Sequence, residues 1–90
     1  MPTQFLCQNE INRLSARLAE VQNKLAVLMN DRDEERRNPT GLRGSRIHAE
    51  IMAEYENVIG SLLDEEVALN NELRDVRIQM QAAIAIPLAA

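Results

Sequence analysis

Apolar residues in the first part of the chain recur at alternating steps of four and three residues, which is the spacing of a coiled-coil seam. The run lasts for three heptads without an intervening Gly or Pro, through Cys7, Ile11, Leu14, Leu18, Val21, Leu25 and Leu28. Residues at this spacing form a stripe along one face of a helix. The pattern therefore predicts a long helix over about residues 3–37.

A second seam with the same spacing predicts a helix over about residues 45–84. Its positions are Met52, Tyr55, Ile59, Leu62, Glu66, Leu69, Leu73, Val76, Met80 and Ala83. Glu66 is the one charged residue in this seam. We expect it either to be buried and to set the register or oligomeric state, or to lie where the seam opens and to reach solvent or Arg17. Gly60 costs the helix about 1 kcal/mol relative to Ala and would let another backbone approach closely.

The two seams fit one another as the arms of an antiparallel hairpin. If the turn is centred near residues 40–42, paired positions have numbers that sum to about 83, and apolar residues face apolar residues at nearly every level. Leu25 then faces Ile59, for example. Because two independent patterns agree on one register, we predict an all-α fold. It would be a single domain over residues 1–90, a long antiparallel helical hairpin with an apolar tail at residues 85–90.

Residues 38–44 contain the helix breakers between the two seams and predict the turn of the hairpin. Asn38 suits the left-handed position that follows a helix, and Pro39 stops the helix. Ser45 is the expected N-cap of the second helix. The sequence therefore predicts a sharp reversal of the chain at this point.

The apolar stripe of the second helix is wider than one partner helix would cover. Residues on both flanks of the seam and in the tail widen it, and these are Ile47, Ile51, Val58, Leu63, Ile84 and Ile86. An isolated two-helix hairpin has a small core, and an uncovered apolar stripe favours association. We therefore expect a homodimer in which two hairpins form a four-helix bundle, with these residues at the dimer or partner interface.

Composition narrows the class of protein further. The 90 residues include one Tyr, one Phe and no Trp, so aliphatic residues must supply the core, as in long helices and coiled coils. The formal charge of −4 disfavours non-specific DNA binding. The single cysteine, Cys7, excludes an intrachain disulfide and a Cys-based zinc site. No signal peptide and no membrane-spanning run is recognisable, so we expect a cytoplasmic protein that does not enter membranes.

Half of the ten basic residues lie within 15 positions around the turn, as Arg32, Arg36, Arg37, Arg43 and Arg46. Arginines beside a flexible turn and a helix N-terminus are elements of an anion site, and His48 would add a ligand. The candidate anion or partner contacts are therefore Arg36, Arg37, Arg43, Arg46 and His48. Many acidic neighbours favour instead a solvated turn in which the arginines are paired and His48 lies at the edge of the seam. Residues 31–37, including the seam position Glu35, are expected to stay helical but to leave the core.

The sequence contains no catalytic or metal-binding constellation. The paired carboxylates at residues 33–35 and 64–66 lack the desolvated cavity that acid–base catalysis needs, and His48 has no partner at metal-ligand spacing. We therefore expect a non-enzymatic protein without a cofactor. The leading hypothesis is a dimeric protein–protein interaction module, a small regulator, inhibitor or assembly factor that binds itself and another protein. The alternatives are anionic-ligand or RNA binding through the arginine-rich tip, and acidic mimicry of nucleic acid.

Overall fold

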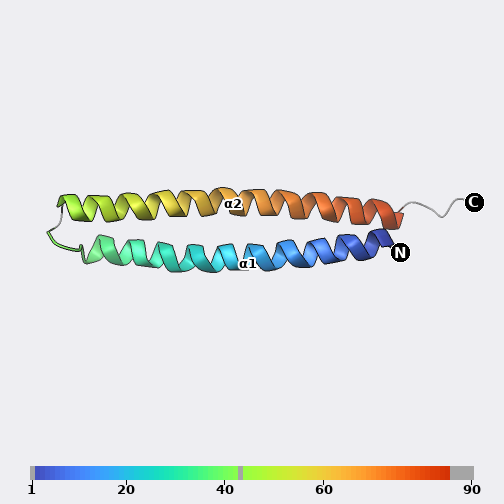
Figure 1. Cartoon of the computed structure of the whole chain (residues 1–90), viewed down its shortest axis with the longest axis horizontal. Helices are drawn as coiled ribbons and strands as arrows, with labels where there is room; N and C mark the ends of the chain where they lie inside the picture. The colour runs from blue at the N-terminus through green and yellow to red at the C-terminus, as the bar shows by residue number, and fades with distance from the viewer. Residues whose placement is uncertain (1, 43, 86–90) are drawn as a thin grey trace, which may run out of the picture.

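The computed structural model describes residues 2–42 and 44–85, which form two long helices joined at one end (Figure 1). Helix α1 spans Pro2–Arg37 and helix α2 spans Arg46–Ala85. The prediction of an all-α helical hairpin is confirmed, because the two helices run in opposite directions along one another. Neither helix, within these residues, has an apolar stretch of the length and hydropathy needed to cross a membrane.

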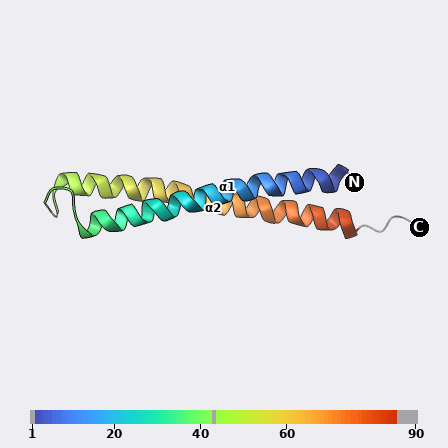
Figure 2. The same cartoon turned by 90° about the horizontal axis from the view of Figure 1, so that it is seen from below.

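The molecule is a thin rod, and its shape limits what the chain can bury by itself. The helices cross at a shallow angle near the middle of their length (Figure 2). At 1.5 Å of rise per residue, α2 alone is about 60 Å long, whereas the two smaller dimensions of the rod are 15 and 14 Å. The core is therefore a single row of contacts between two helices.

The core coincides with the seam that the heptad spacing predicts. Six buried residues form its cluster, and these are Leu14, Val21, Leu25, Ile59, Leu69 and Leu73. Partly buried residues of the two seams pack around them, among them Leu18, Leu28, Tyr55 and Leu62. Leu14 and Val21, one heptad apart, are only 1% and 0% exposed. Cys7 is also buried, as its seam position predicts.

Two polar contacts between the helices report the register independently of the apolar seam. Arg17 binds Glu65, and Glu35 binds His48. The residue numbers sum to 82 in the first pair and to 83 in the second. This agrees with the register that the two apolar patterns predict.

Glycine, and not asparagine, provides the left-handed backbone of the turn. Gly41 and Gly44 have φ angles of 77° and 79°, whereas no non-glycine residue among those described has a positive φ. The prediction for Asn38 is therefore wrong. Its backbone N–H continues the helical pattern by donating to the carbonyl of Glu34 at 2.7 Å, and its side-chain amide donates to the Glu34 carboxylate at 2.7 Å.

The start of α2 follows the predicted capping chemistry. The N–H of Ser45 donates to the carbonyl of Leu42 at 2.9 Å and closes a four-residue turn. Gly44 has the positive φ that glycine adopts without steric cost. The hydroxyl of Ser45 then accepts the N–H of His48 at 3.2 Å, so Ser45 is the N-cap.

Gly60 lies inside α2 beside open space. A Cβ placed on it would meet no described atom within 4 Å. The close approach of a second backbone, expected from this glycine, is therefore not made by α1. The described structure therefore has room for a larger side chain at Gly60, and the glycine only adds backbone flexibility to α2.

Candidate functional site

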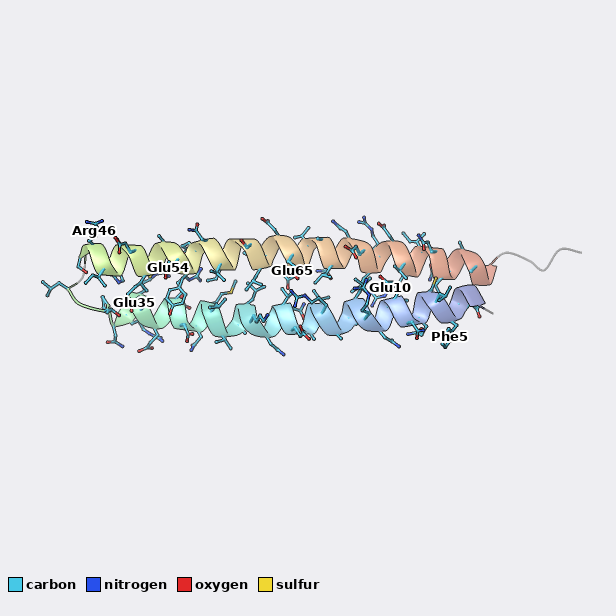
Figure 3. All side chains as sticks on the ribbon, in the orientation of Figure 1. Phe5, Glu10, Glu35, Arg46, Glu54 and Glu65 are labelled. Carbon is cyan, nitrogen blue, oxygen red and sulfur yellow. The ribbon has the colours of Figure 1, made fainter. Side chains whose placement is uncertain are left out.

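Glu35 lies at the end of α1 beside the turn and α2, and it is the one buried charged residue of the described chain (Figure 3). Its carboxylate accepts hydrogen bonds from the backbone N–H of Thr40 at 2.7 Å and from the Thr40 hydroxyl at 2.9 Å. The same carboxylate lies 3.1 Å from Nδ1 of His48. The hydrogen bond from the Thr40 N–H, and then that from His48, lower the pKa of Glu35 below its usual value.

The expectation that Glu35 leaves the core is therefore wrong. Glu35 is only 9% exposed. Hydrogen bonds from polar groups of the turn replace those that its carboxylate would make with water. His48 is the part of this cluster that belongs to α2, and it lies at the edge of the seam with its ring against Glu35. We call Glu35, Thr40 and His48 the tip clasp, because they join the end of α1, the turn and the start of α2.

Arg32, the seam position one turn before Glu35, also stays partly buried. Its Nη1 lies 3.6 Å from the carboxylate of Glu56 on α2, and its Nε lies 3.5 Å from Asp33. This Nε is buried and has no hydrogen-bond partner among the described residues. The charged end of α1 thus remains in contact with α2.

The other described arginines of the tip are engaged by carboxylates of their own helix. The pairs are Arg36 with Asp33 at 3.7 Å, Arg37 with Glu34 at 2.9 Å, and Arg46 with Glu50 at 2.9 Å. Arg46 points away from α1 (Figure 3). Arg43 lies outside the described residues. The cluster that is dense in sequence is therefore divided in space into separate, exposed ion pairs, and such pairs are weak.

Glu65 lies near the middle of the rod, on the side of α2 that faces α1 (Figure 3). Arg17 of α1 joins the helices by binding it. Its Nε donates to Oε1 of Glu65 at 2.8 Å, and its Nη2 lies 2.6 Å from the same oxygen. Of the alternatives given for Glu66, the contact with Arg17 is therefore not formed. Glu66 is half-buried and forms no ion pair with any described residue.

The residues expected at a dimer or partner interface are left uncovered by α1 where the structure describes them. Ile47 and Val58 are 57% and 47% exposed, Leu63 is exposed, and Ile51 is half-buried. The side chain of Ile84 and the whole of Ile86 fall outside the described part. Apolar side chains on both flanks of the α2 seam therefore remain open to solvent in the single hairpin.

Ile51 and Val58 line a shallow groove on one side of the rod, in the half nearer the turn. Two adjoining hollows that share Leu28 make up this tip-half groove. One is lined by Leu28, Ile51, Glu54, Tyr55 and Val58. The other is lined by Asn23, Lys24, Val27 and Leu28. Sequence reasoning missed Val27 because it lies beside the heptad seam, yet its step of three from Lys24 places both on one side of α1.

Further exposed apolar residues lie off both seams and were not predicted from the pattern. They are Phe5 and Leu6 near the start of α1, Leu42 in the turn, and Val67 and Ile78 on α2. Phe5 points away from α2 (Figure 3). Single exposed apolar residues are common on protein surfaces, so the groove, where several converge, is the stronger candidate.

Within the described part of the chain, no three His, Cys, Asp or Glu side chains come together to hold a metal ion. Comparisons of the chain with known protein families, curated proteins and solved structures found no match.

Proposed function

We propose that this chain is a non-enzymatic protein–protein interaction module, a helical hairpin that binds a second copy of itself and a further protein. The observation that carries the proposal is the uncovered apolar surface of α2, with Ile47, Val58 and Leu63 exposed beside a seam that α1 already fills. A rod two helices wide has no interior left in which to bury a second stripe. Its burial requires another chain, and a four-helix bundle of two hairpins supplies one.

A small regulator, inhibitor or assembly factor fits this shape, because such a protein acts by occupying a surface of its partner. The carboxylates beside Arg36, Arg37 and Arg46 support this function over anion or RNA binding, since Asp33, Glu34 and Glu50 offset the positive charge that an anion would need. We propose a cytoplasmic location, because a single buried cysteine, Cys7, fits a reducing compartment.

Sedimentation equilibrium over a range of micromolar concentrations tests self-association. We expect a mass of twice the 10.2 kDa chain that falls toward the single-chain mass on dilution. The single-chain mass at every concentration would refute the dimer.

A titration of structured RNA at low salt tests the competing function. We expect no binding. Binding that is abolished by replacing both Arg37 and Arg46 with Glu would instead assign the tip to RNA.

A further inference from the structure

The tip-half groove is the place where both helices contribute apolar side chains to one side of the rod. Val27 and Leu28 come from α1, and Ile51 and Val58 come from α2. Ile51 and Val58 are one heptad apart, so they lie above one another on the same flank of α2. The groove therefore combines apolar side chains from both helices.

The same flank changes character in the other half of the rod. One heptad after Val58 the flank is occupied by Glu65, and Arg17 lies opposite it on α1. Their hydrogen bond at 2.8 Å closes the flank with charged groups. A chain that docks on the apolar part of this side is thus confined to the tip half.

The charged residues of the groove are distributed in a self-complementary way. Lys24 lies on the α1 wall and Glu54 lies on the α2 wall. Neither forms an ion pair with any described residue. If two copies face each other across a two-fold axis parallel to the rod, α1 of one copy lies over α2 of the other. Lys24 on each α1 wall then faces Glu54 on the α2 wall of the other copy. With the tips at opposite ends, the Lys24 wall would instead lie over a second Lys24 wall.

We propose that the tip-half groove binds the tip-half groove of a second copy of this chain, with both turns at the same end and Lys24 of each copy paired with Glu54 of the other. This inference rests on the proposed function and names the surface that self-association uses. It commits the apolar groove to a second copy, and it leaves the exposed Phe5 and Leu6 at the far end of α1 available to a different protein.

Two valines in α2 provide a matched test by sedimentation equilibrium. Val58 lies in the groove and is 47% exposed, whereas Val67 is 58% exposed and nine residues further on. At 100° per residue, nine residues place Val67 on the opposite side of the helix. We expect Val58→Asp to raise the dimer dissociation constant by at least about tenfold, because it replaces an apolar contact with a carboxylate that loses its hydration in the interface. Val67→Asp should change it by less than about twofold.

A charge-exchange cycle tests the orientation. Lys24→Glu and Glu54→Lys should each weaken the dimer, and the double variant should restore its dissociation constant to near the wild-type value. The control for net charge combines Lys24→Glu with Asp64→Lys, since Asp64 is exposed and does not line the groove. This control should not restore the dimer. Circular dichroism of every variant verifies that the helices are intact.

The outcomes separate the two proposals. A wild-type dimer that survives Val58→Asp, or that Val67→Asp disrupts, overturns the groove and leaves the dimeric function standing. A double variant no tighter than the net-charge control overturns the arrangement with both turns at one end. A monomeric wild-type chain overturns the inference and the proposed dimer together.

Discussion

Replacing Gly60 with Ala should stabilise the hairpin by about 1 kcal/mol. Gly60 lies in the interior of α2 without a positive φ, and a Cβ there would meet no described atom within 4 Å. The added methyl group therefore causes no clash that would offset the gain. The gain arises because alanine restricts the backbone of the unfolded chain more than glycine does. In a domain of this size it corresponds to a rise in Tm of roughly 4–8 °C.

Thermal and urea unfolding followed by circular dichroism measure this change. The protein concentration must be the same for each variant, because the stability of a dimer depends on it. Ala53→Gly is the matched control, since Ala53 is exposed in the same helix one heptad before Gly60. This control should lose about 1 kcal/mol, so the two changes should be nearly equal and opposite.

A destabilised Gly60→Ala variant would refute this reasoning. It would mean that another backbone packs directly against Gly60. If the loss grew as the protein concentration was raised, that backbone would belong to a second copy. Gly60 is two residues, and hence about 200°, from Val58, so the dimer contact would then lie away from the tip-half groove.

Further predictions concern the seam, the tip clasp and the thiol. Leu14→Ala should lower the free energy of unfolding by about 3 kcal/mol, because Leu14 is 1% exposed and its truncation leaves a cavity in the seam; a loss below about 1 kcal/mol in urea unfolding would contradict the seam as the main source of stability. Glu35→Gln should lower the Tm at neutral pH. The pKa of Glu35 is lowered in the folded state, so its contribution is present above the unfolded pKa of about 4.3 and is lost as the pH falls through the folded pKa. The Tm difference from wild type should therefore shrink in melts taken toward about pH 3, and a constant difference would disprove the role of the carboxylate. The buried thiol of Cys7 should react with an aromatic disulfide reagent much more slowly in the native protein than in urea; equal rates would show that this end of the seam is open.

The heptad pattern was sufficient to predict the two helices, the seam and the register. Leu14 and Val21 show why, since a step of seven residues returns to the same face of a helix and these two are the most buried side chains. Once the seams define which faces of the two helices meet, the register of the hairpin depends on where the turn reverses the chain. The helix breakers around Pro39 set that position.

The polar contacts were harder to predict, because they depend on geometry finer than the level of pairing. Sequence alone favours solvent for Glu35, because burying a carboxylate is costly. The N–H of Thr40 that binds it reaches it only after the turn has formed. Glu65 and Glu66 lie at nearly the same level as Arg17 and differ in the flank of α2 on which they lie. Arg17 and Glu65 each follow a seam residue by three positions, and this shared offset was the signal in the sequence that would have identified the pair.

The arrangement of contacts also determines how the hairpin forms and how it opens under load. The contact between Glu35 and His48 closes a loop of 13 residues, whereas that between Arg17 and Glu65 closes one of 48. If the longer loop closes first, its loop-closure entropy costs about 1 kcal/mol more than that of the shorter loop. Once the tip has formed, each further level adds only a few residues to the loop. We therefore expect the hairpin to close first at the turn and then toward its open end. We also expect a force that pulls the start of α1 from the end of α2 to break the tip clasp last.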